Sequence, residues 1–204
     1  LRCLVGSEMC IRDRAMESDW ENAGRFLKTI KSEGDRMSRL IGDMLSLANA
    51  DNKSWSIMKT DCELDTLLLD TYEKYQPILH GKKISLKVVL PEEPLSICKC
   101  DSARISQVLG ILLDNGASYV SAGGRMEMGV KENEKYFQLY VQDNGPGIPD
   151  ENKEAVFRRF YRADPARKEK QHFGLGLCIA REIVTLHKGL SLIHISEPTR
   201  HLRI

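Results

Sequence analysis

The sequence predicts an α+β fold, in which a long amphipathic helix precedes a two-layer α/β sandwich with helices covering a mixed sheet. Two observations support this prediction. Between residues 20 and 50, apolar side chains recur at heptad spacing, which is typical of a helix that packs against partner helices. From residue 84 to residue 189, segments of alternating apolar and polar residues are interleaved with segments of helical periodicity, which places sheet and helices in one domain.

Composition and charge restrict the function classes. The chain has 204 residues, of which 42% are hydrophobic, and this suits one globular domain with a smaller additional element. Its 30 basic and 29 acidic residues give a net charge of +1, so neither nucleic acid nor a membrane surface is expected as a partner. No apolar run approaches the roughly 20 residues that span a bilayer. The 6 cysteines include no C-x-x-C pair, which favours a reducing, cytoplasmic location.

The two ends of the chain read as opposite strands of one DNA segment. Residues 190–200, LSLIHISEPTR, can be encoded by a DNA whose reverse complement, in a shifted frame, encodes LVGSEMCIRD, residues 4–13. This DNA resembles a transposase-type sequencing adapter. We therefore expect residues 1–14 and 190–204 to derive from an adapter, and we exclude them from fold prediction. The residues between them are predicted to be a piece of a longer protein.

The predicted long helix covers residues 20–50. Its heptad positions form a narrow apolar seam made of Phe26, Ile30, Met37, Leu40, Met44 and Leu47. Glu33 interrupts this seam, and Gly24, Gly34 and Gly42 each lower helix stability by about 1 kcal/mol relative to alanine. We therefore expect this helix to need partner helices.

The remaining elements follow in chain order. Residues 51–61 are predicted to form a linker or a short strand, and a second helix begins near residue 62 and ends near Gly81. Asp101 is a good N-cap for a helix over residues 102–120. The other predicted segments are strands over 84–91 and 95–100, a hairpin over 124–133 and 135–143, and helices over 153–161 and 174–188.

The loop DNGPGIP, which directly follows the last hairpin strand, is the first candidate for a ligand site. Asp143 can accept a hydrogen bond from an exocyclic amine, and Gly145 and Gly147 would let a flat ring approach the backbone. These properties outline an adenine pocket. The loop alone is equally compatible with a plain strand-to-helix turn in which Pro146 and Pro149 restrict φ.

A second candidate is the segment HFGLGLCIAREI. Gly174 and Gly176 stand where a helix begins, and the free N–H groups and positive dipole end there favour phosphate oxygens. The sequence contains no G-x-x-x-x-G-K-[ST] motif and no strand-G-x-G-x-x-G-helix unit, which excludes a P-loop motif and leaves a Rossmann site without support.

The third candidate lies on the helix before the loop. Asn115, Ser118 and Tyr119 are spaced i, i+3 and i+4 and therefore share one face. Asn115 could offer a neutral oxygen to a Mg²⁺ ion that bridges phosphates, and Tyr119 could cover a base. The alternative is that Asn115 is an ordinary helix-end residue and Tyr119 belongs to the core.

Taken in order, these segments resemble a known family. QVLGILLDNGASYV, DNGPGIP, VFRRFYR and GLGLCIAREIV are similar to the N, G1, F and G2 boxes of sensor histidine kinases, which have a Bergerat-type ATPase fold. FLKTIKSEGDRMSRLIGDMLSLANAD resembles the second helix of their dimerisation domain. The resemblance implies a partial histidine-phosphotransfer domain over residues 15–52 and an ATP-binding catalytic domain, without its final strands, over residues 53–189.

The resemblance also implies ATP and Mg²⁺ as ligands and assigns roles to residues. Asn115 would bind Mg²⁺, Asp143 would bind the adenine amino group, and Gly145 and Gly147 would lie beneath the ring. An ATP lid would extend from about Arg162 to Phe173. Gly174, Leu175 and Gly176 would close on the phosphates. The other expected nucleotide-binding residues are Ser118, Tyr119, Ile148, Phe160, Arg162, Lys168 and Leu177.

The chain departs from the family pattern in three places. The position of Ser118 is commonly a lysine or histidine in the family, and Arg162 and Lys168 could compensate for this lost cation. None of the chain's histidines, His80, His172, His187, His194 and His201, has the sequence context of the phosphoacceptor. The final strand pair is also expected to be absent, which would leave an exposed sheet edge.

The parent protein is implied to transfer the γ-phosphoryl group of ATP to a histidine and then to an aspartate in a response-regulator receiver domain. It is expected to be a homodimer, anchored to a membrane through an absent upstream region, with this fragment in the cytoplasm and without membrane contact of its own. The fragment itself supplies no catalytic acceptor residue.

Three alternatives remain at this point. A gyrase-type ATPase would carry a glutamate one turn before the Mg²⁺ asparagine, where this chain has Ile111, which cannot act as a base. An anti-sigma-type serine kinase would not usually carry the long first helix. A non-catalytic nucleotide-binding or dimerisation module is the remaining alternative, and Ser118 is its best support.

Overall fold

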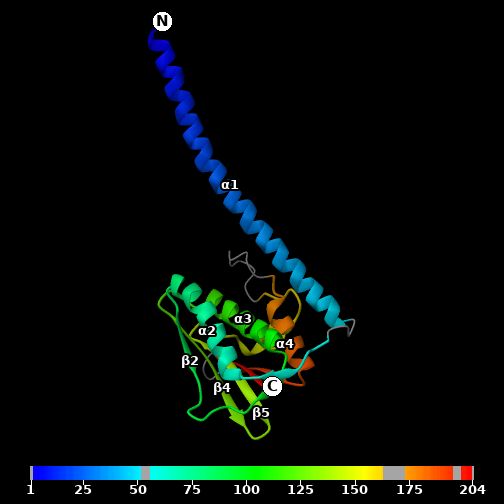
Figure 1. Cartoon of the computed structure of the whole chain (residues 1–204). Helices are drawn as coiled ribbons and strands as arrows, with labels where there is room; N and C mark the ends of the chain where they lie inside the picture. The colour runs from blue at the N-terminus through cyan, green and yellow to red at the C-terminus, as the bar shows by residue number, and fades with distance from the viewer. Residues whose placement is uncertain (1, 52–55, 163–172, 195–198, 204) are drawn as a thin grey trace. The chain divides into compact units, whose positions relative to one another are not determined.

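The computed structural model describes residues 2–51, 56–162, 173–194 and 199–203, and the chain divides into two units, Leu1–Met44 and Leu45–Ile204 (Figure 1). The first unit is helical and belongs to α1 (Arg2–Asp51), which continues into the second unit. Among the described residues, no helix combines the length and the apolar character that crossing a membrane requires.

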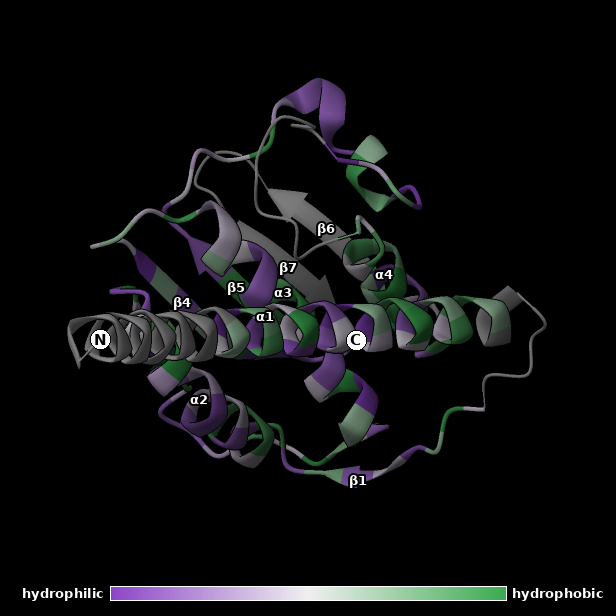
Figure 2. Ribbon diagram, turned by 90° about the horizontal axis from the view of Figure 1, so that it is seen from above, coloured by the Kyte–Doolittle hydropathy of each residue, from purple (hydrophilic) through white to green (hydrophobic). Residues whose placement is uncertain are grey.

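Helix α1 confirms the predicted helix, and its apolar seam is exposed except at its end, where Leu40 is half-buried and Leu47 buried. Phe26 is 69% exposed, Ile30 66% and Met37 62%, and Figure 2 shows hydrophobic and hydrophilic residues interspersed along α1. The helix begins at Arg2, although residues 1–14 were excluded from the prediction. Residues 2–14 contain no proline to stop a helix that propagates from its neighbours. The origin of these residues stays a prediction.

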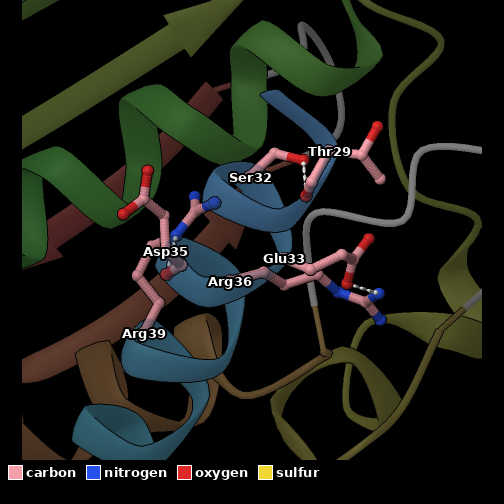
Figure 3. Close-up of polar contacts among 6 residues, drawn as sticks. All are labelled: Thr29, Ser32, Glu33, Asp35, Arg36 and Arg39. Atoms are coloured by element: carbon pink, nitrogen blue, oxygen red, sulfur yellow. Dashed lines mark hydrogen bonds and ion pairs between the residues drawn. The ribbon is translucent and has the colours of Figure 1, made fainter. Parts of the chain in front are cut away.

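Local polar contacts support the part of α1 between Thr29 and Arg39 (Figure 3). The Oγ of Ser32 donates to the carbonyl of Thr29 at 2.8 Å, and Nη1 of Arg36 pairs with Oε2 of Glu33 at 3.1 Å. Glu33, which interrupts the apolar seam, thus takes part in an i, i+3 ion pair. Such pairs contribute about 0.2–0.5 kcal/mol to an isolated helix.

The second unit contains a five-stranded sheet of order β2-β4-β5-β7-β6 among the described residues. Strand β2 (Ser85–Val89) pairs in parallel with β4 (Arg125–Asn133), and every other neighbouring pair is antiparallel, so the sheet is mixed as predicted. Strand β5 (Tyr136–Asp143) completes the predicted hairpin with β4.

Three helices cover this sheet. They are α2 (Leu64–Gly81), α3 (Ser102–Tyr119) and α4 (Gly176–Leu186), and Figure 1 shows them together on one side of the strands. The core between the two layers is made of fully buried side chains from both: Leu64, Leu68, Leu79, Ile105, Leu109, Leu113, Met126, Met128, Leu139, Ile179 and Ile183. Each such side chain contributes roughly 1.5–3 kcal/mol by leaving water.

A separate two-stranded sheet joins β1 (Thr60–Cys62) to β3 (Cys98–Cys100). Its strands are antiparallel, with Cys62 opposite Cys98 and Thr60 opposite Cys100. Of the two predictions for residues 51–61, a linker or a short strand, the strand is therefore confirmed at residue 60. The strand predicted over residues 95–100 is present but shorter, because it begins at Cys98.

The end of the chain differs from the expectation that final strands are absent. Strands β6 (Leu190–His194) and β7 (Thr199–Arg203) are present, and β7 pairs with β5 from Gln142 opposite Thr199 to Gln138 opposite Arg203. The physical reason is that β5 would otherwise present unpaired N–H and C=O groups, which any extended segment can satisfy. The expected exposed edge at β5 is therefore occupied, while the adapter origin of residues 190–204 stays a prediction.

The prediction of a helix over residues 153–161 is wrong. The structure has two short 3₁₀ turns there, η1 (Asp150–Asn152) and η2 (Ala155–Phe157). Arg158 has an extended backbone (φ −76°, ψ 146°), and Phe160 has a positive φ of 60°. Neither conformation continues a right-handed helix.

Candidate functional site

Helix α3 carries the predicted polar face, and its start is held from several sides. Oδ1 of Asp101 accepts a hydrogen bond from the backbone N–H of Arg104 at 3.1 Å, which confirms Asp101 as the N-cap. Oδ2 of Asp101 accepts from the N–H of Met58 at 3.2 Å. One side chain therefore caps α3 and also ties the segment before β1 to it.

His187, which follows α4, joins that helix to the start of α3. Its side chain is 5% exposed, with Nδ1 lying 2.8 Å from the carbonyl oxygen of Ile183 and Nε2 3.0 Å from the N–H of Asp101. Because the first partner can only accept and the second can only donate, the ring is neutral with its proton on Nδ1. Sequence reasoning placed His187 at a helix end but did not anticipate this bridge.

The three predicted residues of α3 lie on its last two turns, and all are half-buried: Asn115, Ser118 and Tyr119. The Oγ of Ser118 donates to the carbonyl of Asp114 at 2.9 Å. Ser118 thus binds its own helix, a common arrangement for serine in helices.

The loop after β5 begins with a tight turn. Oδ1 of Asp143 accepts a hydrogen bond from the N–H of Gly145 at 2.9 Å. A methyl group at Gly145 would lie only 2.8 Å from this oxygen, so any larger residue would make the Asp143 carboxylate shift. Gly147 has a φ of +74° and open space where a side chain would stand. The two glycines therefore act differently: Gly145 leaves the Asp143 carboxylate in place, and Gly147 permits a positive φ.

The end of α3 lies against this loop. A methyl group at Gly116 would lie 3.5 Å from Oδ2 of Asp143, and one at Gly145 would lie 3.5 Å from the carbonyl oxygen of Tyr119. Asn115 immediately precedes Gly116 and therefore shares its turn of α3. Gly116 was not singled out from the sequence, although a helix-interior glycine costs about 1 kcal/mol and so usually has a packing reason.

Ile111, one turn before Asn115 on α3, contacts the start of α4. A methyl group at Gly176 would lie 3.1 Å from Cγ2 of Ile111 on α3. Among the described residues, no side-chain hydrogen bond caps α4, and Leu175 before it is 1% exposed. Leu177 is half-buried. The first N–H groups of α4 therefore stand beside the polar face of α3 without a side-chain cap.

The residues on either side of the expected lid contact each other. The N–H of Phe160 donates to the carbonyl of Gly174 at 3.0 Å. Gly174 has a φ of +73°, and a methyl group there would lie 2.5 Å from the carbonyl oxygen of Tyr161. Phe160 is 58% exposed and Arg162 is exposed. Lys168 lies outside the described residues, and Ile148 is half-buried in the loop after β5.

Helix α2 touches α3 close to Asn115. Oη of Tyr75 lies 3.5 Å from Oδ2 of Asp114, and a methyl group at Gly110 would lie 2.7 Å from the same Oη. Burial, and then the negative charge and hydrogen bond of Asp114, raise the pKa of Tyr75 to about 12. Gly110 thus makes room for a tyrosine that contacts the residue next to Asn115.

Comparison with known proteins places this geometry in a family. Residues 100–204 match the family described as "Histidine kinase-, DNA gyrase B-, and HSP90-like ATPase". The match begins at the last residue of β3 and includes α3, the loop after β5, and α4.

Individual relatives agree with this match. Sensor histidine kinase WalK of Bacillus subtilis (strain 168) is 35% identical over 182 residues, which cover 85% of this chain and 29% of the relative. Full-length ShkA in complex with AMPPNP superposes with a TM-score of 0.77 at 19% identity, over 87% of this chain and 37% of that one. Histidine kinase ThkA in complex with the response regulator protein TrrA has a TM-score of 0.66 at 22% identity, over 83% and 48%. The chain thus spans 29% of the length of WalK.

Proposed function

Because this chain belongs to the family of histidine kinase-, DNA gyrase B- and HSP90-like ATPases, we propose that it binds ATP along the last two turns of α3. One observation supports this position for the ATP site. Helix α3 brings Gly116 close to Asp143 and, one to two turns earlier, Ile111 close to Gly176, so the loop after β5 and the start of α4 both lie beside the last turns of this helix. The proposed site lies between these three elements.

We propose that Asp143 binds the exocyclic amine of adenine. Its Oδ1 is engaged by the N–H of Gly145, which fixes the carboxylate while Oδ2 faces Gly116. The open space at Gly147 suits a flat ring, because any side chain there would occupy it. Ile148, Tyr119 and Phe160 would supply apolar contacts to the base, a combination that ligand pockets commonly use.

The phosphates are proposed to bind at the start of α4, at Gly174, Leu175, Gly176 and Leu177. The N–H groups of a helix N-terminus and its positive dipole end favour anions. The positive φ of Gly174 and its close approach to Tyr161 permit glycine alone at the entrance of this helix. Arg162 and Lys168, from the expected lid, would add positive charge in place of the cation that Ser118 does not provide.

Mg²⁺ is proposed to enter together with the phosphates. Among the described residues, no group of three or more His, Cys, Asp or Glu side chains could hold a metal ion. Asn115 would contribute one amide oxygen, and a hard cation that keeps several waters needs few protein ligands when phosphates supply the rest. Bound Mg²⁺ would neutralise charge on the phosphates during phosphoryl transfer.

The reaction that we propose for the parent protein is transfer of the γ-phosphoryl group to a histidine. The chain would contribute ATP binding and orientation, since none of its own histidines has the expected acceptor context. A response-regulator receiver domain would then take the phosphoryl group, as the response regulator TrrA is bound by ThkA. Homodimerisation through α1, whose apolar seam is exposed, and a cytoplasmic location belong to the same proposal.

Two features bear on the alternatives. Ile111, where a hydrolytic relative would carry a glutamate, packs against Gly176 and can neither accept a proton nor orient water. Hydrolysis is therefore disfavoured. The hydroxyl of Ser118 donates to the carbonyl of Asp114 and brings no positive charge, which keeps a non-catalytic nucleotide-binding module as the second candidate.

The proposal is tested by titrating a fluorescent ATP analogue into the full 204-residue chain with and without Mg²⁺. Asp143→Asn is expected to abolish binding in both conditions, because an amide cannot replace both acceptor oxygens. Asn115→Ala is expected to weaken binding of the ATP analogue in the presence of Mg²⁺ and to leave binding without Mg²⁺ unchanged. The matched controls are Asp70→Asn and Asn133→Ala, which change exposed residues of α2 and β4. Equal binding by the Asp143→Asn variant and the unchanged folded chain would refute the site.

A phosphotransfer assay then separates the two candidates. The chain is mixed with radiolabelled ATP, Mg²⁺ and a separately produced dimerisation domain that carries an acceptor histidine from a related kinase. Acid-labile phosphate on that domain supports the kinase function. Nucleotide binding without transfer, under conditions in which an intact related kinase does transfer, supports the non-catalytic module.

A further inference from the structure

The small sheet formed by β1 and β3 carries three thiols on one face. Cys62 stands opposite Cys98, and Cys100 shares the face of Cys98 because alternate residues of a strand point the same way. All three side chains are buried. The opposite face carries the exposed pair Asp61 and Lys99, whose charged atoms lie 3.8 Å apart.

The register places the backbones of Cys62 and Cys98 directly opposite each other, while the thiol of Cys100 hydrogen-bonds with those of both Cys62 and Cys98. Residues directly opposite in an antiparallel pair have Cα atoms about 4.5 or 5.5 Å apart. Disulfide-linked cysteines usually have Cα atoms about 4.4–6.8 Å apart, so this pair can be bridged without moving the strands. Cys98 and Cys100, two positions apart on one strand, are about 6.6 Å apart, close to the outer limit.

The three thiols differ in their chemical environments. A hydrogen bond from Cys100 and, to a smaller extent, the positive charge of Lys59 lower the pKa of Cys98. Burial raises the pKa of Cys62, and the hydrogen bond to Cys98 raises that of Cys100. Lys59 is held in this region because its Nζ donates to the carbonyl of His187 at 3.4 Å. Cys98 is therefore the thiol most readily converted to the nucleophilic thiolate.

We propose that Cys62 and Cys98 form a reversible disulfide when the protein meets a hydroperoxide, which makes the small sheet a redox modification site. The Cys98 thiolate attacks an oxygen of the peroxide, the O–O bond breaks, and Cys98 becomes a sulfenic acid while the second oxygen leaves as water or an alcohol after taking up a proton. The sulfur of Cys62 then attacks that of Cys98. The S–S bond forms, the S–O bond breaks, and water leaves with the proton of Cys62.

The bond would connect two important points of the domain. Cys62 ends the strand that precedes α2, and Cys98 stands three residues before Asp101, the N-cap of α3. Closing the chain between them restricts the unfolded state and so raises the denaturant midpoint of the oxidised protein. The segment that follows α1 would thereby be joined covalently to the strand that leads into α3.

The test is peptide mapping of the full chain after treatment with hydrogen peroxide, alkylation of the remaining thiols and digestion with trypsin. Cleavage at Lys59, Lys74, Lys87, Lys99 and Arg104 places the three cysteines on separate peptides, residues 60–74, 88–99 and 100–104. We expect peptide 60–74 to be linked to peptide 88–99, and a reducing thiol to release both. A dominant link from peptide 100–104 to either of the other two peptides, or no link at all, would overturn the proposal.

Variants separate the roles of the thiols. Cys62→Ser should leave a sulfenic acid on Cys98 that a cyclic 1,3-dione traps, and Cys98→Ser should remove both the trap product and the disulfide. Cys100→Ala should slow oxidation, because Cys98 loses its hydrogen-bond donor. Cys178→Ser is the matched control, since that thiol lies on α4 and is less buried, and it should leave the link unchanged.

A final experiment uses only the unchanged chain, so its result does not depend on whether the variants fold. The unchanged chain is oxidised both in buffer and in concentrated urea. In the unfolded chain the register that places Cys62 opposite Cys98 is lost, so the link between them should no longer dominate. If the folded and the unfolded chain give the same pattern of links, the fold does not direct the reaction and the proposal is wrong.

Discussion

The backbone N–H of Asp101 donates a hydrogen bond of 3.0 Å to Nε2 of His187, so a buried ring at the end of α4 holds the residue that caps α3. The two residues are 86 positions apart in sequence. Because α3 carries Asn115 and the chain entering α4 carries the glycines of the proposed phosphate site, this bond helps to set the distance between the two sides of the site.

Replacement of His187 by leucine should therefore destabilise the domain. The change leaves the N–H of Asp101 without its acceptor in a part-buried place, which costs about 1–3 kcal/mol. His187→Gln, whose oxygen can reach the position of Nε2, should recover part of this loss. Urea denaturation followed by circular dichroism measures both variants, and equal stability of the leucine variant and the unchanged chain would contradict the prediction.

Asp101→Ala should cost about 1–2 kcal/mol, because it removes the cap of α3 and also the acceptor of the Met58 N–H. Asp101→Asn should cost less, since asparagine is also a good N-cap. The measurement is again denaturant unfolding. If the two variants are equally unstable, the negative charge rather than the capping geometry is what matters at Asp101.

Two glycines with positive φ should respond differently to alanine. Gly174→Ala places a methyl group 2.5 Å from the backbone oxygen of Tyr161, which cannot easily move, whereas Gly147→Ala meets no atom within 4 Å. The Gly147 change should cost about 1 kcal/mol of backbone strain, and the Gly174 change should cost clearly more. Thermal unfolding of both variants tests this order, and a more stable Gly174→Ala variant would show that the contact between Gly174 and Tyr161 is not formed.

Stability should fall at alkaline pH because of Tyr75. Its pKa is raised from 10.0 to about 12 in the folded chain, so the unfolded chain loses this proton first. The contribution is complete below about pH 10 and is lost as pH rises toward 12. Tyr75→Phe should remove this part of the pH dependence and change stability little at neutral pH, where the hydroxyl makes only a 3.5 Å contact.

The measurement for Tyr75 is the free energy of unfolding at several pH values between 9 and 12, together with the ultraviolet absorbance of ionised tyrosine. Tyr140→Phe is the companion variant, because burial and then Glu127 also raise the pKa of Tyr140. An unchanged alkaline slope in the Tyr75→Phe variant would show that Tyr75 titrates normally in the folded chain.

Local signals in the sequence predicted much of this domain. The carboxylate of Asp101 indicates a helix start, and α3 begins at Ser102. Alternation predicts β4 and β5, whose hairpin is found nearly as expected. These features depend on residues close together in the chain, where propensity and periodicity are informative. The glycines of the loop after β5 were singled out for the same reason.

Features that depend on distant partners could not be predicted. The pairing of Cys62 with Cys98 follows from the register of two very short strands, which tertiary packing decides. The roles of Gly110 and Gly116 become visible only when Tyr75 and Met126 approach them. The strands β6 and β7 form because β5 offers unpaired backbone groups, and this property of the sheet is absent from the local sequence of residues 190–203.

The hydrogen bond between Phe160 and Gly174 also bears on how this domain tolerates insertions. It clamps both ends of the intervening segment with residues that lie outside the segment. Doubling the length of such a segment raises its closure free energy by only about 0.6 kcal/mol. A change in the length of the segment between Phe160 and Gly174 should therefore alter the closure free energy of this loop only slightly.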